Sequence, residues 1–115
     1  MLIHFNDMKA DLPGSICRVA DFLGIPVRQE ILPVITEHCS FDYMKANAER
    51  MAPRGGGMWK GGAKTFINKG TNGRWRDTLT AKEIADYDSK ALAELGYDCA
   101  KWLASGNEAI TATTP

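Results

Sequence analysis

The sequence predicts the mostly α C-terminal segment of an α/β domain, with about five helices and one short N-terminal strand. Apolar residues recur at helical spacing along most of the chain, whereas only residues 2–5, LIHF, read as a strand. A single strand cannot make a sheet by itself, so it needs neighbours that this chain does not supply. The helices have apolar faces that would pack on such a sheet, which indicates part of a domain.

Three helices are expected in the first half of the chain. The first has apolar residues at helical spacing, with Pro13 in its first turn and Gly24 as its stop. The second runs from about Arg28 to His38, with Pro33 near its start. The third follows Ser40, a good N-cap. Its apolar face comprises Phe41, Met44 and Ala48.

Two more helices are expected in the second half. Thr80 and Glu83 have the spacing of a capping box, in which each side chain accepts a hydrogen bond from the other residue's backbone. The helix that they begin ends at Gly96, and Asp98 caps a last short helix that stops at Gly106.

The length does not exceed that of one small domain, and we read residues 1–106 as the C-terminal segment of the α/β domain. A polar tail, 107–115, follows and is expected to be disordered. The hydrophobic content of 44% and charged content of 24% are ordinary for a globular protein. We expect a cytoplasmic protein with reduced thiols, because the three cysteines are widely spaced and odd in number and no signal peptide or membrane-spanning run is recognised. The cysteines are Cys17, Cys39 and Cys99.

Positive charge and glycine gather in one segment. Residues 53–76 contain six basic residues, no acidic residue and seven of the eleven glycines. A basic, glycine-rich segment on an otherwise acidic chain is a candidate anion site. A solvated flexible loop fits the composition equally well.

Several catalytic and binding motifs fail on inspection. Gly57 and Gly62 have the spacing of a phosphate-binding P-loop, but Ala63 intrudes before Lys64 and displaces the lysine from its phosphate. The two histidines are far apart and show no zinc or iron pattern, so no metal is expected. No nucleophile and base with a third orienting group are apparent.

One motif survives. Residues 68–80, NKGTNGRWRDTLT, resemble the Arg-Lys-Gly-x-x-Gly-Asp-Trp-Lys-Asn-x-Phe-Thr motif of sulfotransferases that use 3′-phosphoadenosine 5′-phosphosulfate (PAPS), sharing the lysine, both glycines, the tryptophan and the last threonine. The segments HFNDMK, VADFLGI and EHCSFDYMK are similar to three other family motifs and follow in family order. These matches cover nearly the whole chain, which resembles the C-terminal part of a bacterial-type cytosolic sulfotransferase.

The resemblance implies a P-loop-type α/β parent fold, a parallel sheet with flanking helices. The parent enzyme transfers a sulfonate from PAPS to a hydroxyl or amine of a small-molecule or glycan acceptor and releases the 3′,5′-bisphosphate nucleotide. The resemblance implies no metal and no membrane partner, and nucleic acid is not the expected ligand.

The resemblance places the 3′-phosphate of the nucleotide at Asn68, Lys69 and Gly70. Glycine lets the backbone approach a phosphate closely, and lysine adds a mobile positive charge. Asn68 stands where the family has arginine, so it donates an amide hydrogen bond and no charge. Arg74 stands where the family has aspartate and restores charge to the loop.

The adenosine is implied to lie along residues 39–44. Phe41 and Met44 would contact the base, and Cys39 or Ser40 the ribose-phosphate region. The alternative is that Ser40 caps a helix while the other side chains fill a core, and both can hold together. Phe5 occupies the position of a family tyrosine and, without a hydroxyl, can only pack.

The resemblance assigns no catalytic residue to this chain. The family's sulfonate-binding loop and catalytic histidine have no match in the sequence, and sulfonate transfer needs both charge stabilisation and a general base. We therefore expect the chain alone to be inactive.

The family's dimer motif, Lys-x-x-x-Thr-Val-x-x-x-Glu, falls on Arg76, Thr80, Ala81 and Ala85. We expect this dimer not to form, because Ala81 lacks apolar bulk and Ala85 lacks the charge. Two other functions remain open. One is a stand-alone anion- or nucleic-acid-binding module that uses residues 54–76, and the other is a non-catalytic interaction protein.

Overall fold

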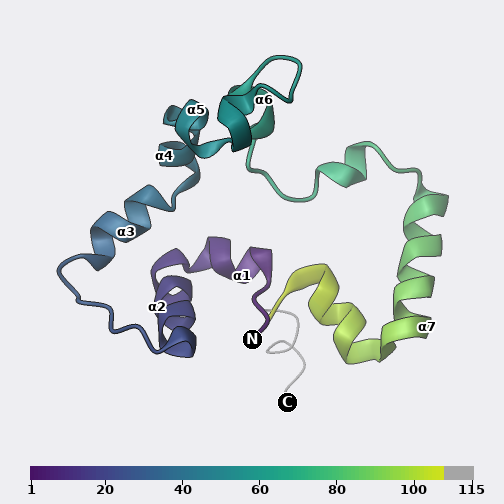
Figure 1. Ribbon diagram of the computed structural model, residues 1–115. Coiled ribbons are helices and arrows are strands. Elements are labelled where there is room, and N and C mark those ends of the chain that lie inside the picture. Colours follow the sequence, from purple (N-terminus) through teal and green to yellow (C-terminus); the bar gives the residue numbers. More distant parts are fainter. Residues whose placement is uncertain (108–115) are drawn as a thin grey trace. The chain divides into compact units, whose positions relative to one another are not determined.

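The structure is a computed structural model that describes residues 1–107, and every regular element in this range is a helix (Figure 1). The chain divides into two compact units. Within the described residues, unit 1 comprises residues 1–11 and 72–107, and unit 2 comprises residues 12–71. The tail expected at 107–115 lies outside the described residues except for Asn107.

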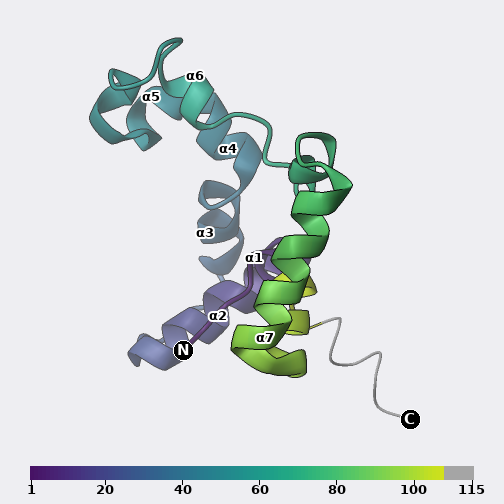
Figure 2. The same ribbon diagram turned by 90° about the vertical axis from the view of Figure 1, so that its right-hand side faces the viewer.

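Unit 1 contains α1 (Phe5–Ala10), the 3₁₀ helix η2 (Arg74–Asp77) and the long helix α7 (Ala81–Ser105), which Figure 2 shows from the side. The predicted capping box is present at Thr80 and Glu83. Gly96 interrupts α7 with φ of 73° and ψ of 171°, a conformation that glycine adopts readily, so α7 consists of two helical arms.

The N-terminus of α1 packs beside the C-terminal end of α7. The His4 Nε2 lies 3.0 Å from the carbonyl oxygen of Leu103, and the imidazole meets the Trp102 ring edge-on at 5.2 Å. The backbone N–H of Asn107 donates to both oxygens of Asp7, at 3.0 and 3.1 Å. The two ends of the described chain are thereby joined within one unit.

The predicted strand at residues 2–5 was wrong, because residues 1–107 contain no strand. His4 instead caps α1, with its Nδ1 accepting the backbone N–H of Asn6 at 3.1 Å. The alternation of LIHF fits an extended chain, but an isolated strand leaves its backbone groups without partners. Residues 2–4 are irregular instead, and α1 begins at Phe5, with the His4 carbonyl accepting the backbone N–H of Met8 at 3.0 Å.

Unit 2 contains α2 (Leu12–Leu23), α3 (Leu32–His38), α4 (Phe41–Ala46), α5 (Ala48–Met51), the 3₁₀ helix η1 (Pro53–Gly56) and α6 (Ala63–Phe66). As predicted, α2 ends before Gly24, which has φ of +69°. The predicted start of the second helix at Arg28 was wrong by four residues. Residues 28–31 form a turn, because Pro33 is tolerated only in the first turn of a helix.

The third predicted helix is shorter than expected. It breaks at Asn47, whose side-chain amide donates to the carbonyl of Tyr43 at 2.9 Å, the same carbonyl that accepts the backbone N–H of Asn47 at 3.0 Å. The segment 54–62 is largely irregular, as predicted, but it begins within η1, where Arg54 has φ of 51°. The short helix α6 was not predicted.

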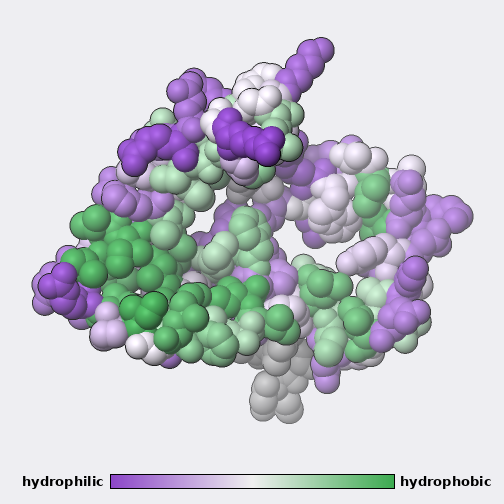
Figure 3. Space-filling model, in the orientation of Figure 1, coloured by the Kyte–Doolittle hydropathy of each residue, from purple (hydrophilic) through white to green (hydrophobic). Residues whose placement is uncertain are grey.

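The buried core of the described residues is made of small side chains. Ala48, Ala52 and Ala63 form a cluster where α5, η1 and α6 meet, with Ile67 packed against it. Among residues 1–107 no large side chain is fully buried. Figure 3 shows apolar surface over the α2 and α3 region, where several large apolar residues are more than half exposed. These are Phe22, Leu23, Ile25 and Val34.

Within residues 1–107 no helix is long and apolar enough to cross a bilayer.

The capping box of α7 predicts a pH dependence. The Glu83 carboxylate accepts hydrogen bonds from the backbone N–H and the hydroxyl of Thr80, both at 2.8 Å, and the backbone bond is the larger cause of a pKa below the ordinary 4.5. Because the folded pKa is the lower one, the cap is fully formed above pH 4.5 and is lost as pH falls through the folded pKa.

We therefore expect the Thr80 amide resonance to titrate with a midpoint below 4.5. NMR at a series of pH values measures this midpoint. The Glu83→Gln variant is the control, in which the Thr80 amide should not titrate. A midpoint at or above 4.5 in the wild type would show that the carboxylate is not held by the cap.

Candidate functional site

Seven of the eight expected nucleotide-site residues lie in unit 2, in two short segments. Residues 39–44 run from the end of α3 into α4, and residues 68–70 form irregular backbone after α6. The eighth, Phe5, begins α1 in unit 1.

Ser40 caps α4, as predicted. Its backbone is extended, with φ of −71° and ψ of 151°, and its hydroxyl oxygen accepts the backbone N–H of Tyr43 at 3.1 Å. His38 stacks on the Tyr43 ring with centroids 4.4 Å apart. This stack and the cap fix the turn between α3 and α4, in which Cys39 is exposed.

The backbone of Gly70 lies against the ring of Phe41. Gly70 has φ of +63°, and a Cβ atom there would stand only 2.6–2.9 Å from three ring carbons of Phe41. Atoms at such short distances overlap. No side chain therefore fits at position 70 unless the Phe41 ring moves. Gly70 and Phe41, which come from the two segments expected to bind the 3′-phosphate and the adenosine, are therefore in direct contact.

Lys45 joins the same two segments, and sequence reasoning missed it. Its ammonium donates to the carbonyl oxygen of Asn68 at 2.9 Å and lies 5.5 Å from the centroid of the Phe41 ring. A signal was available in the sequence. Lys45 ends the matched segment EHCSFDYMK, and it follows Phe41 by four residues, the spacing that puts side chains on one helix face.

Lys69 is exposed, and within residues 1–107 it has no acidic partner. An unpaired ammonium on irregular backbone can turn toward an anion at little cost. Met44 is half-buried on α4. The structure thus brings Phe41, Asn68 and Gly70 together, with Lys69 between the last two.

Phe5 belongs to the other unit. The residue is 53% exposed, and the ammonium of Lys9 lies 5.8 Å from the centroid of its ring.

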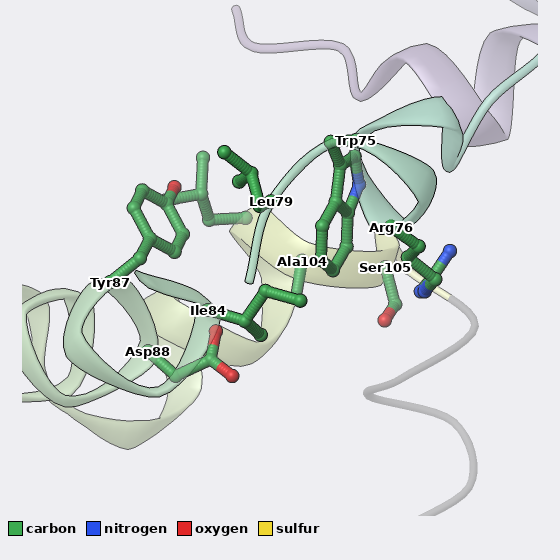
Figure 4. A pocket seen from close by; sticks show the side chains of 9 residues that line it. Trp75, Arg76, Leu79, Ile84, Tyr87, Asp88, Ala104 and Ser105 are labelled. Carbon is green, nitrogen blue, oxygen red and sulfur yellow. The ribbon is translucent and has the colours of Figure 1, made fainter. Parts of the chain in front are cut away.

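Trp75 lines a cavity of about 430 Å³ in unit 1, between η2 and the two arms of α7 (Figure 4). Its walls are mainly apolar, and Arg76 and Asp88 are its charged members. The guanidinium of Arg76 lies 4.5 Å from the centroid of the Trp75 ring, which is the distance of a cation–π contact. Trp75 therefore contacts residues of unit 1, and its side chain remains partly exposed.

The arrangement in unit 2 suits a phosphate with an attached aromatic ring. It offers one mobile lysine, backbone that can approach closely at a glycine, and an aromatic ring beside both. Within residues 1–107 no group of three or more His, Cys, Asp or Glu side chains could hold a metal ion.

Comparison with known proteins gives a consistent match. The family model for the sulfotransferase domain matches residues 1–96. The chain is similar to mouse sulfotransferase 2B1, with 29% identity over 77% of this chain and 27% of the relative, and to human sulfotransferase 2B1, with 31% identity over 76% and 24%.

A glycolipid sulfotransferase of Mycobacterium bovis is 27% identical over 91% of this chain and 32% of its own length. The chain therefore spans a quarter to a third of the curated relatives that it matches. No solved structure gives a significant match.

The contact between Gly70 and Phe41 predicts an asymmetric response to alanine. Gly70→Ala adds a methyl group that overlaps the Phe41 ring. Gly24 has a similar backbone conformation, with φ of +69°, but a methyl group added there would have no other atom within 4 Å. We expect Gly70→Ala to destabilise unit 2 by about 1–3 kcal/mol more than Gly24→Ala, the usual cost of overpacking. Urea titration followed by NMR measures the difference.

In the same spectra the Phe41 ring and Lys45 signals should shift in Gly70→Ala and stay in place in Gly24→Ala. Equal free energies and unmoved Phe41 signals in both variants would contradict the contact.

Proposed function

This chain belongs to the sulfotransferase domain family, and we propose from that premise that it holds part of the PAPS site of a sulfotransferase. The part is the side that binds the 3′-phosphate and the adenosine. The parent reaction would be transfer of a sulfonate from PAPS to a hydroxyl or amine acceptor.

One observation carries this proposal. The two sequence segments that resemble the adenosine and 3′-phosphate motifs are far apart along the chain, yet Phe41 and Gly70 touch and Lys45 bonds to Asn68. A pair of unrelated surface loops would have no reason to place these residue types together. The proximity supports a single ligand that spans a phosphate and an aromatic base.

Each side chain has a role that its chemistry allows. Lys69 provides charge to the 3′-phosphate and Gly70 provides close backbone approach. Phe41 and Met44 provide an apolar edge for the adenine, and Cys39 and Ser40 lie toward the ribose.

The chain would bind the donor nucleotide or its bisphosphate product without turning it over. No residue of the sequence matches the family's general base or its sulfonate-binding loop, and the reaction requires both functions. Affinity should also be low, on the order of millimolar, because Asn68 brings no charge.

A basic, glycine-rich module that binds nucleic acid or other anions is the second candidate. It is favoured by the charge of residues 54–76, which include Lys60 and Lys64 in addition to Lys69. In such a module every exposed lysine of the segment would contribute similarly to the binding free energy. In the proposed nucleotide site Lys69 would contribute the most.

Lys69→Ala separates the two candidates. We expect it to weaken binding of 3′,5′-adenosine bisphosphate about 10-fold or more, the effect of losing a hydrogen bond to a charged group. Chemical-shift titration at low salt measures the affinity, and added salt should weaken it further because the charges are exposed.

Lys64→Ala is the matched control, since it removes one exposed lysine from the same unit outside the proposed site. It should change the affinity less than about 2-fold, because an exposed charge that does not touch the ligand is screened by salt. If both variants weaken binding equally, the basic module is the better description. If neither variant changes the affinity, the proposed site is wrong.

A further inference from the structure

We propose that Lys45 is a positioning residue for recognition of the 3′-phosphate. It would act by holding the peptide bond between Asn68 and Lys69 in one orientation, without touching the nucleotide. This inference rests on the proposed function, and it assigns a task to a side chain outside the set expected from the sequence.

The ammonium of Lys45 is held at two points. It donates to the carbonyl oxygen of Asn68 at 2.9 Å, and it lies 5.5 Å from the centroid of the Phe41 ring. The first contact is an ordinary charge-assisted hydrogen bond, and the second is within cation–π range. Both contacts restrict a long side chain that would otherwise sample many rotamers.

The Asn68 carbonyl shares a peptide plane with the backbone N–H of Lys69. In a trans peptide the C=O and N–H bonds point to opposite sides, and the plane moves as one body. A lysine that fixes the carbonyl on the side of α4 therefore directs the Lys69 N–H to the other side. That N–H is one of the donors that a phosphate beside Lys69 and Gly70 would use.

The same face of α4 also contacts the loop at Gly70. Phe41 and Lys45 are four residues apart on α4, and the Phe41 ring lies against Gly70. The loop is thus fixed at Asn68 by a hydrogen bond and at Gly70 by a ring. Lys69 stands between these two points with its side chain exposed.

Electrostatics give the hydrogen bond a second effect. An uncompensated carbonyl oxygen carries partial negative charge, which opposes an approaching phosphate. The Lys45 ammonium neutralises this dipole on the far side of the peptide. Because Asn68 contributes no charge of its own, the loop depends on such preorganisation more than a loop with arginine there would.

The test compares two ligands that differ only in the 3′-phosphate. Chemical-shift titrations of the 115-residue chain with 3′,5′-adenosine bisphosphate and with 5′-AMP give the selectivity for that group. We expect Lys45→Met to weaken bisphosphate binding roughly 10-fold, the loss expected for a charge-assisted hydrogen bond, and to change 5′-AMP binding less than 2-fold.

Lys45→Arg should restore the selectivity to within about 3-fold of the wild type, because the guanidinium can donate to the same carbonyl. Lys64→Met is the matched control for net charge, and its selectivity should equal that of the wild type. In the ligand-free Lys45→Met spectrum the Ala48, Ala52 and Ala63 amides should stay in place, which reports that the small core is intact.

The possible results are distinguishable. A wild type that does not prefer the bisphosphate would overturn the proposed function itself, and this inference with it. A selective wild type whose selectivity survives in Lys45→Met would overturn this inference alone. Equal weakening of both ligands, or displaced core amides in Lys45→Arg as well as Lys45→Met, would show that Lys45 serves the fold and not the phosphate.

Discussion

The contact of the Phe41 ring with the Gly70 backbone is the constraint on which the site in unit 2 depends. It joins a helix to the irregular backbone of residues 68–70. Only glycine fits there, because any Cβ would overlap the ring and the φ of +63° disfavours other residues. The Lys45 ammonium then adds a polar link to the same loop.

The small core sets how firmly this contact can be held. Ala48, Ala52 and Ala63 are buried, but alanines remove little apolar area from water, and no large side chain is fully buried within the described residues. The contacts of α4 with residues 68–70 therefore contribute a larger share of the local stability than they would beside a large core. The exposed apolar residues of α2 and α3 are of the kind that pack against other parts of a larger domain.

The sequence predicted features that depend on neighbours along the chain. The capping box at Thr80, the N-cap at Ser40 and the stop at Gly24 were confirmed, because each is decided within one helical turn. The strand at residues 2–5 was wrong because a strand depends on partners elsewhere. The hydrogen bond of Lys45 was missed because its partner, the Asn68 carbonyl, is distant in sequence and belongs to the backbone.

The most direct test of the central claim, that α4 and the loop at 68–70 bind one nucleotide, is an isotope-filtered NOESY spectrum of the chain with 3′,5′-adenosine bisphosphate. We predict cross-peaks from the adenine protons to the Phe41 ring and the Met44 methyl group, together with a larger shift of the 3′-phosphorus than of the 5′-phosphorus. Cross-peaks confined to the aromatic rings of residues 54–66, or equal shifts of both phosphorus signals, would contradict it.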